Sequence, residues 1–182
     1  FKTSASAGVK LWAWDTQFDQ SIENFTGNSE AYLIGCTGGT GFAITPSNSA
    51  KARIYRWVEI TVQDGMVPSN PLPGANVWLN SSFGYTDLDK SGTTGSTGVF
   101  RTYALSDYIY DSFGAPYVFH CSLYDLEVSY PDVPAISTQL ALAEYPSMGT
   151  SDATAEKTVT FLMVVPDLAI ETMMPSATVG RG

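Results

Sequence analysis

The only histidine, His120, limits the nucleophilic chemistry open to this chain. A Ser–His–Asp or Cys–His site would have to use it, and Cys121 follows it directly in the sequence. Both residues lie in the apolar segment 117–123, which is typical of a β-strand. Because successive side chains of a strand point to opposite faces, His120 and Cys121 do not readily form a dyad. We therefore expect His120 to be a core or surface histidine.

Paired carboxylates are the next candidates, since two of them can supply the acid and the base of glycoside hydrolysis. The pairs with suitable spacing are Asp87 with Asp89, Asp107 with Asp111, and Asp125 with Glu127. No pattern distinguishes any of them from solvated loop charge. The sequence also lacks a Walker loop, a dinucleotide fingerprint and HExxH, and one histidine with two cysteines is a poor zinc set. We expect no catalytic residue and no enzyme activity.

One motif indicates a metal site. Asp87, Asp89 and Ser91, followed by Gly92, match the opening of a calcium loop, in which oxygens at alternate positions converge on one ion. The twelfth position is Gly98 rather than the bidentate Glu of an EF-hand, and flanking helices are not evident. A solvated turn is the alternative. The acidic surplus of the chain favours calcium at a subunit or domain junction, and calcium is the one cofactor that we expect.

Charge and composition exclude several kinds of partner. Among 182 residues, 9 Lys+Arg face 18 Asp+Glu, which gives a formal net charge of −9. Such a chain repels phosphate backbones and anionic lipid heads, so we expect neither nucleic acid nor membrane insertion. Hydrophobic residues make up 44% and charged residues only 15%. The composition therefore predicts a sizeable core and a Ser/Thr/Asn/Gly-rich surface, as in an adhesin or a coat subunit.

Features of exported proteins point to an extracellular or cell-surface location. Cys36 and Cys121 are compatible with one disulfide or with two buried thiols, because the sequence does not show whether the sulfurs meet. Asn24 and Asn80 begin sequons that would accept glycans in a cell with that machinery. The chain begins at Phe1 rather than Met, so we expect a processed or excised chain.

Alternating apolar and polar residues, punctuated by Gly, Pro and Asn, predict an all-β fold. The expected strands cover residues 9–14, 30–36, 51–62, 75–79, 99–105, 117–126 and 158–165, with a loop at 80–98 and either a helix or a strand at 138–144. This pattern favours an antiparallel β-sandwich, jelly-roll or Ig-like. Residues 1–50 would pack on or extend the sandwich of residues 51–165, and residues 166–182 would form a tail, a donated strand or the start of another β-domain.

Aromatic residues are abundant, with 4 Trp, 10 Tyr and 9 Phe. In alternating strands most aromatic side chains belong to the core. We therefore expect most of these residues to be buried, and Tyr103, Tyr108, Tyr110 and Tyr130 to be exposed contacts.

The central part of the chain resembles the carboxypeptidase regulatory-like family of small β-sandwich modules. The resemblance rests on Ile-Thr-Val-Gln-Asp at 60–64, Pro-Gly-Ala-Asn-Val-Trp-Leu at 73–79 and Thr-Gly-Val-Phe at 97–100. It covers about residues 58–125, with a longer insertion between 80 and 97 as a departure.

Two flanking segments resemble other modules of large prokaryotic envelope proteins. Residues 12–19 and 31–36 are similar to the last rungs of β-helices in archaeal surface proteins, whereas residues 166–171 and 177–180 are similar to the opening of a CARDB-type adhesion domain. Together these resemblances imply an extracellular scaffold or adhesion role, of the archaeal cell-surface type, without an active site.

These observations predict a structural subunit of an extracellular filament, tubule or surface layer. An unpaired edge strand can accept a strand from another copy, so terminal segments could link subunits into a polymer by strand donation, with calcium at the junctions. The expected partners are copies of the chain itself or neighbouring envelope domains, and a glycan is a further one. The alternative function is a carbohydrate- or surface-binding adhesion module of a larger envelope protein.

Overall fold

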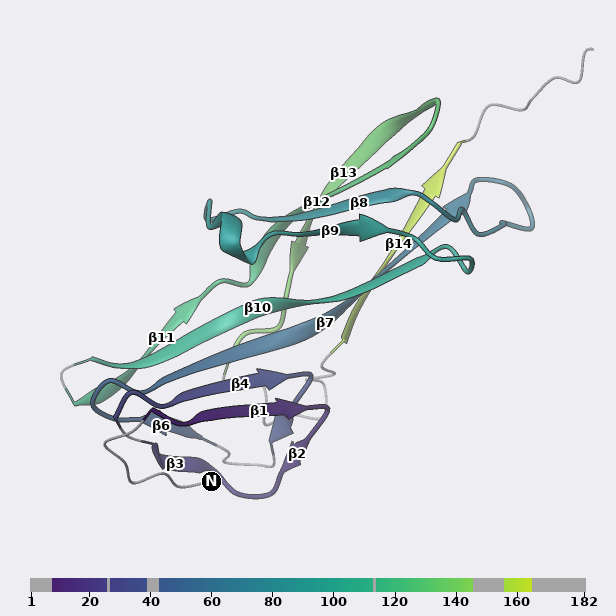
Figure 1. Ribbon diagram of the computed structural model, residues 1–182. Helices are drawn as coiled ribbons and strands as arrows, with labels where there is room; N and C mark the ends of the chain where they lie inside the picture. Colours follow the sequence, from purple (N-terminus) through teal and green to yellow (C-terminus); the bar gives the residue numbers. More distant parts are fainter. Residues whose placement is uncertain (1–7, 26, 39–42, 113, 146–155, 165–182) are drawn as a thin grey trace, which may run out of the picture.

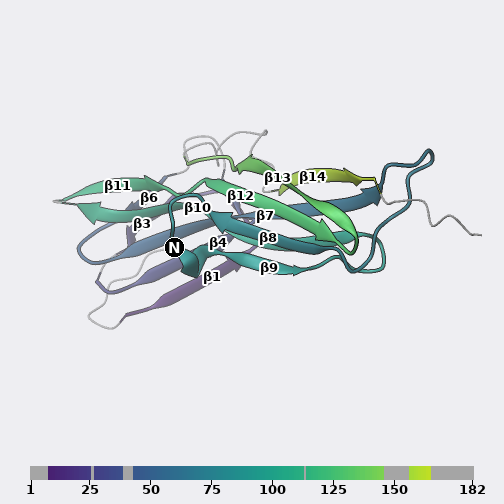
Figure 2. The same ribbon diagram turned by 90° about the horizontal axis from the view of Figure 1, so that it is seen from above.

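In the computed structural model, two packed β-sheets make up most of the described residues, which are 8–25, 27–38, 43–112, 114–145 and 156–164. The larger sheet has the order β1-β4-β7-β10-β11, and β14 also pairs with β7; the smaller sheet has the order β13-β12-β8-β9 (Figure 1). Seen from above, the strands of both sheets run roughly along one long axis, as in an aligned sandwich (Figure 2). The predicted all-β sandwich is confirmed.

The strands of the larger sheet are β1 (Lys10–Trp14), β4 (Glu30–Ile34), β7 (Lys51–Asp64), β10 (Val99–Ser112), β11 (Ala115–His120) and β14 (Glu156–Met163). Those of the smaller sheet are β8 (Asn76–Ser81), β9 (Lys90–Thr93), β12 (Leu123–Tyr130) and β13 (Val133–Ala141). The larger sheet is mixed, since β1 with β4, β4 with β7 and β14 with β7 are parallel pairs. Purely antiparallel pairing, as predicted, holds only for the smaller sheet.

The N-terminal strands form two stacked coils of chain. In the first coil β1 is followed by β2 (Gln17–Phe18) and β3 (Ile22–Phe25), and in the second β4 is followed by β5 (Thr37–Gly38) and β6 (Ile44–Pro46). Each strand of the first coil pairs in parallel with its counterpart in the second. The coils bury Ile22, Leu33 and Ile44 between them and the sheet, in a core that also contains Ile54 and Ile109.

The long strand β7 links this first core to a second one. Its residues alternate strictly between buried and half-buried along all 14 positions, because every second side chain points to the interior of the sandwich. Ile54 belongs to the core under the coils, whereas Val58, Ile60 and Val62 belong to the core between the two sheets. Arg56 lies on the same buried face between the two groups and is 2% exposed.

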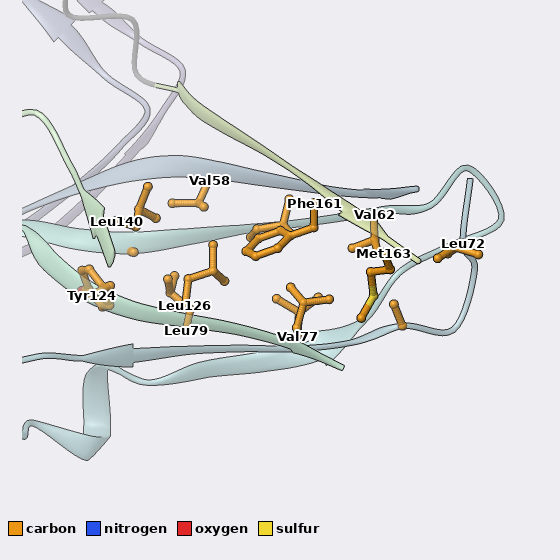
Figure 3. Close-up of a cluster of buried hydrophobic side chains, with 14 of the residues drawn as sticks. Val58, Val62, Leu72, Val77, Leu79, Tyr124, Leu126, Leu140, Phe161 and Met163 are labelled. Atoms are coloured by element: carbon orange, nitrogen blue, oxygen red, sulfur yellow. The ribbon is translucent and has the colours of Figure 1, made fainter. Parts of the chain in front are cut away.

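The second core fills the space between the sheets. Side chains of Val77, Leu79 and Leu126 from the smaller sheet point toward Val58 and Phe161 of the larger one (Figure 3). Burying such an aliphatic side chain completely stabilises the fold by about 1.5–3 kcal/mol each. This interior is what holds the two sheets together.

Strand β10 is longer than the sequence predicts. A register shift between Leu105 and Asp107 in the pairing with β7 marks a β-bulge at Ser106. A bulge inserts one residue and re-aims the side chains beyond it. Beyond the bulge β10 continues past residue 105, where the predicted strand ends, and it pairs with both β7 and β11.

The predicted loop at 80–98 contains regular structure. It holds a short 3₁₀ helix, η1 (Thr86–Leu88), and strand β9, which completes the smaller sheet; η1 is the small coil between β8 and β9 in Figure 1. Gly92 of β9 lies against Phe100, and a Cβ at this glycine would come within 2.3 Å of the phenyl ring. The glycine therefore permits close packing of β9 over β10.

Two further predictions concern the C-terminal half. Residues 138–141, for which a helix and a strand were both open, continue strand β13. Residues 166–182, predicted to be a tail or the start of another domain, lie outside the described residues. Within the described part, no helix is long and apolar enough to cross a membrane.

Candidate functional site

The outward face of the larger sheet carries a row of side chains that crosses five strands. Strand pairing places Trp12 of β1 opposite Tyr32 of β4, Tyr32 opposite Arg53 of β7, Arg53 opposite Tyr108 of β10, and Tyr108 opposite Phe119 of β11. All five point away from the interior, because each occupies the half-buried or exposed phase of its strand. The row is thus fixed by backbone register alone.

Direct contacts join the members of this row. The rings of Trp12 and Tyr32 stack with their centroids 4.0 Å apart and their planes 4° from parallel. The guanidinium of Arg53 lies 5.0 Å from the centroid of Tyr32 and 5.3 Å from that of Tyr108, within the range of cation–π attraction. Because Arg53 is held between two rings, it keeps little freedom to move.

Glu30 neutralises Arg53. Its carboxylate lies 3.2 Å from Nη1 of Arg53 and accepts a hydrogen bond of 2.6 Å from the Tyr32 hydroxyl. The Tyr32 hydrogen bond and the Arg53 charge outweigh burial and lower the pKa of Glu30 below its ordinary value. Burial and the bond to Glu30 raise the pKa of Tyr32. The three side chains therefore form one charge-balanced unit.

A second aromatic group lies beside this row. Tyr103 has the rings of Trp14, Tyr55 and Trp57 around it at centroid distances of 5.4, 5.4 and 5.9 Å, each nearly perpendicular to its own ring. Edge-to-face contacts of this kind are worth about 0.5–1.5 kcal/mol each. The Lys90 ammonium lies 5.4 Å from the centroid of Tyr103.

A glycine makes this second group possible. The Trp57 indole N–H donates a hydrogen bond of 2.6 Å to the carboxylate of Asp15. Gly35, with φ of +62°, lies beside this bond, and a Cβ there would be 2.3 Å from the Asp15 oxygen and 2.5 Å from the indole nitrogen. A larger residue at position 35 would break the bond that orients Trp57.

The β8–β9 connection covers part of this face. Leu88 of η1 reaches the sheet near Leu105, and Phe83 and Tyr85 lie against Phe119 with centroids 6.1 and 6.2 Å apart. The connection is anchored at its base, because the carboxylate of Asp89 accepts a hydrogen bond of 2.8 Å from the backbone N–H of Ser81.

Two cavities lie between this cover and the sheet, and Leu88 and Leu105 line both of them. The larger measures about 290 Å³ and the smaller about 100 Å³. Side chains that line the larger one are Arg53, Tyr85, Leu88, Leu105, Tyr108, Phe119 and Cys121. Those that line the smaller one are Trp12, Tyr55, Leu88, Lys90, Tyr103 and Leu105. We call the two cavities together the aromatic groove.

A third hollow, of about 410 Å³, adjoins the larger cavity at Tyr108. Its walls differ in kind, since they include the polar turn of Asn48 and Ser49 together with Lys51 and Asp111. Aromatic walls with a few charged groups are typical of sites for small organic ligands. The aromatic groove fits that description better than the third hollow does.

A separate cluster of polar side chains, which we call the polar junction, runs from buried Asp107 and Arg56 to His120 and Glu144, whose side chains are 42% and 49% exposed. Asp107, which the bulge at Ser106 precedes, is fully buried, and its Oδ1 lies 2.7 Å from Nδ1 of His120. Its Oδ2 accepts hydrogen bonds from the Ser106 hydroxyl at 2.7 Å and from the backbone N–H of Tyr145 at 3.0 Å. Asp107 thus joins β10, β11 and the segment after β13.

Glu144 and Arg56 complete the polar junction. Glu144 accepts a hydrogen bond of 2.5 Å from the Ser122 hydroxyl and lies 3.7 Å from His120. Arg56 donates from Nε to the carbonyl of Ala143 at 3.1 Å, while its Nη1 and Nη2 have no hydrogen-bond partner among the described residues. Burial lowers the pKa of Arg56, and the charge of Asp107 partly offsets this.

An Asp–His pair can orient an imidazole for proton transfer. His120, however, points to the opposite side of β11 from Phe119 and Cys121, which line the larger cavity. The polar junction and the aromatic groove are therefore two separate places. The sequence does not reveal the pairing of His120 with Asp107, because the bulge that brings them together leaves no recognisable pattern.

The aromatic residues differ from the prediction. Trp12, Trp14 and Trp78 are 51%, 45% and 37% exposed, so these tryptophans are not core residues. Tyr103 and Tyr108, predicted as exposed contacts, are half-buried walls of the groove. The alternation in β1 could have revealed this, because Leu11 and Ala13 occupy its inward phase and the tryptophans its outward phase.

The calcium prediction is wrong. The Asp89 carboxylate is engaged by the Ser81 backbone, and Ser91 lies in a strand where Gly92 serves packing rather than a sharp turn. The side chain of Asp87 lies outside the described residues. Within the part of the chain that is described, no three His, Cys, Asp or Glu side chains gather in a way that could hold a metal ion.

The other predicted modification sites are dispersed. Cys36 and Cys121 are both buried and are not joined by a disulfide. Cys36 packs in the core under the coils, and burial raises the pKa of its thiol. Asn80 is exposed on β8, whereas Asn24 lies on β3 next to residues outside the described set. Glycosylation at either position stays a prediction.

Neither a family model nor a curated protein sequence matches this chain. Solved structures similar to it include catechol 1,2-dioxygenase from Acinetobacter sp. ADP1 inhibited by bound mercury, with 12% identity, a TM-score of 0.41 and coverage of 87% of this chain and 59% of that chain. The Pseudomonas arvilla C-1 enzyme has 13% identity, a TM-score of 0.39 and coverage of 91% and 62%. Wild-type Acinetobacter radioresistens catechol 1,2-dioxygenase has 14% identity, a TM-score of 0.40 and coverage of 100% and 64%. The chain thus spans about three fifths of the length of these proteins.

These findings correct the predicted identity. The similar structures are enzymes, not carboxypeptidase regulatory-like modules or filament subunits, and no family model supports the latter. The predictions of an extracellular structural or adhesion protein, of calcium and of a chain without enzyme activity are accordingly not retained. TM-scores near 0.4 are too low for the likeness to assign an activity or a ligand to this chain. The proposal below therefore rests on the groove itself.

Proposed function

We propose that this chain binds a small organic molecule with a flat apolar ring in the aromatic groove. The observation that carries the proposal is the pair of adjoining cavities, of about 290 and 100 Å³, between η1 and the outward face of the larger sheet. Their combined size lies near the lower end of ligand sites, which measure about 300–1,000 Å³. A ligand of one or two rings matches this space.

The walls of the groove suit such a ligand. Tyr85, Tyr108 and Phe119 supply ring surface in the larger cavity, and Leu88 and Leu105 supply aliphatic surface where the two cavities meet. Ring–ring contacts add about 0.5–1.5 kcal/mol each to what the burial of apolar area contributes. Each ring contact formed in the groove would therefore add measurably to affinity.

Preorganisation also supports binding. The sheet side of the groove is built on β7, β10 and β11, whose mutual pairing fixes the positions of Arg53, Tyr108 and Phe119. A site that is already ordered loses little conformational entropy when its ligand arrives. The cover on the other side comes from the short η1 segment, which is anchored through Asp89.

A fluorescence titration with N-phenyl-1-naphthylamine tests the proposal. This uncharged two-ring probe brightens when it leaves water, and we expect saturable binding with one site per chain. Leu88→Arg places a long charged side chain where the two cavities meet and should weaken binding at least about tenfold, since it blocks ring burial. Val67→Arg is the control, because Val67 is 99% exposed and lies on the distant β7–β8 connection. The proposal fails if the wild-type chain does not bind the probe, or if the Leu88 variant binds it as well as the control does.

A further inference from the structure

The charges around the aromatic groove do not follow those of the whole chain. The chain contains 18 acidic and 9 basic residues. Among the described side chains, those that line the two cavities nevertheless include Arg53 and Lys90 and no Asp or Glu. If the charged residues of the groove followed the composition of the whole chain, the groove would be acidic. The excess of positive charge among its described lining residues is therefore a feature of the site.

Arg53 and Lys90 differ in whether a carboxylate balances their charge. Arg53 is neutralised by Glu30 at 3.2 Å and is held between the rings of Tyr32 and Tyr108. Lys90 lies 5.4 Å from the ring centroid of Tyr103, and in the described residues no carboxylate lies within ion-pair distance of its ammonium. Among the described side chains, Lys90 therefore contributes a positive charge without a paired carboxylate to the wall of the smaller cavity.

We propose that the groove selects anionic ligands, with the ring of the ligand in the larger cavity and its carboxylate or sulfonate group at Lys90 in the smaller one. This inference rests on the proposed function and adds the chemical class of the ligand. An ammonium offers three donors and a full charge to such a group. The rings of Trp12, Tyr55 and Tyr103 line this cavity, and charge–charge attraction beside apolar surface is stronger than in bulk solvent.

The position of Leu88 and Leu105 sets the shape of this ligand. Both side chains line both cavities, so a ligand that occupies both cavities must lie against Leu88 and Leu105. A molecule whose anionic group is attached directly to its ring system, or through a short linker, can place the ring on one side and the charge on the other. A long flexible acid would lose more conformational entropy for the same contacts.

A matched pair of probes tests the inference. 8-Anilinonaphthalene-1-sulfonate and N-phenyl-1-naphthylamine share the same two-part aromatic skeleton, but only the first carries a sulfonate. We expect the wild-type chain to bind the sulfonate probe about tenfold or more tightly, in line with a hydrogen bond to a charged group. Lys90→Met should remove that preference while leaving the affinity for the uncharged probe within about twofold, because Met keeps most of the apolar stem.

Lys10→Met is the matched control variant. Lys10 lies on the same sheet face and carries the same charge, but it is 65% exposed, lies 3.9 Å from Glu30 and lines neither cavity. It should leave both affinities unchanged. Raising the salt concentration from 20 to 300 mM should weaken only the sulfonate probe in the wild-type chain, since salt screens charge–charge attraction. Cooperative thermal unfolding of each variant confirms that it is folded.

The outcomes separate the two proposals. Equal affinity for both probes in the wild-type chain, or an equal loss of both affinities in Lys90→Met, overturns the anion preference and leaves ring binding in place. Failure of the wild-type chain to bind either probe overturns the proposed function and the anion preference together. A loss of sulfonate affinity in Lys10→Met as large as in Lys90→Met also contradicts the role of Lys90, because it would show a general charge effect.

Discussion

The aromatic groove and the polar junction lie on opposite faces of β7, β10 and β11, and their charged side chains have different surroundings. In the groove, Lys90 has the ring of Tyr103 beside it, no described carboxylate lies within ion-pair distance of its ammonium, and the smaller cavity adjoins it. In the junction, Asp107 is fully buried and has three hydrogen-bond contacts. An unmatched charge beside a cavity is available to a ligand, whereas a saturated buried charge serves the fold.

The comparison teaches that burial alone does not identify a functional group. Asp107 and Arg56 are charged residues that lie almost completely buried in the interior of the sandwich, so their burial is more unusual than that of Lys90 or Arg53. Their contacts, however, connect β7, β10, β11 and the segment after β13 where two apolar cores meet. We therefore expect substitutions in the junction to lower stability, and substitutions in the groove to change binding with little effect on stability.

Asp107→Ala should have the largest effect of the substitutions considered. It leaves Arg56 as a buried cation without its nearby anion, removes the carboxylate partner of His120 and the Tyr145 backbone N–H, and leaves the Ser106 hydroxyl with only the Ile54 carbonyl as acceptor. Removing one partner of a buried charged pair costs about 3–5 kcal/mol. Urea unfolding followed by circular dichroism would measure this loss, and Asp125→Ala, at an exposed position of β12, should change stability by less than about 0.5 kcal/mol. Similar values for the two variants would refute the structural role of the junction.

Arg56→Met should cost less than Asp107→Ala and so sharpens the comparison within the junction. The substitution removes two N–H groups that have no partner among the described residues, while Asp107 keeps its other contacts. An apolar side chain of similar length also joins the two cores, so we expect a loss of only about 1–3 kcal/mol. The same urea experiment measures it. A loss greater than that of Asp107→Ala would mean that Arg56, not Asp107, organises the junction.

Trp12→Ala should separate stability from binding in the groove. Trp12 is 51% exposed and stacks on Tyr32, so its removal should cost only about 0.5–1.5 kcal/mol of unfolding free energy. It also lines the smaller cavity, and we expect severalfold weaker binding of 8-anilinonaphthalene-1-sulfonate. Trp78→Ala, at a 37% exposed position of the smaller sheet, is the control. Unchanged binding in Trp12→Ala would remove the smaller cavity from the site.

The pH dependence of Glu30 should give the smallest effect. The pKa of Glu30 is lowered in the folded chain by Tyr32 and Arg53. Its contribution to stability is therefore complete above its ordinary pKa of 4.5 and is lost as the pH falls through the lower folded value. Glu30→Gln should flatten this acid limb by less than about 1 kcal/mol, since exposed pairs are weak. Urea midpoints between pH 3 and 6 would show it, and an unchanged slope would argue against the Glu30–Arg53 pair.

Much of the fold could be predicted because it depends on local alternation. The pattern of β7 gives its buried face residue by residue, and the strands around Leu33, Leu126 and Phe161 follow from the same rule. The parallel pairing of the N-terminal coils could not be derived from local alternation, because parallel and antiparallel strands alternate alike. The length of β10 was missed because its bulge at Ser106 interrupts the alternation that identifies a strand.

The candidate site was harder to predict for a similar reason. Arg53, Tyr108 and Phe119 come from three strands, and only their pairing register brings them into one row. Leu88 and Lys90 belong to a segment whose Asp and Gly residues indicate a calcium loop, although the chain uses them for anchoring and packing. The residue types therefore identified the segment that lines the candidate site, but they indicated calcium binding instead of the proposed ligand binding.

The central claim is that the aromatic groove is the place where a small ring-bearing anion binds. A titration of the ¹⁵N-labelled chain with 8-anilinonaphthalene-1-sulfonate, followed by two-dimensional NMR, tests it most directly. The account predicts that amide signals of Leu88, Lys90, Tyr103 and Phe119 shift together in a saturable manner. Shifts confined instead to the exposed apolar residues Met66, Val67 and Val164, or to the polar junction, would contradict it.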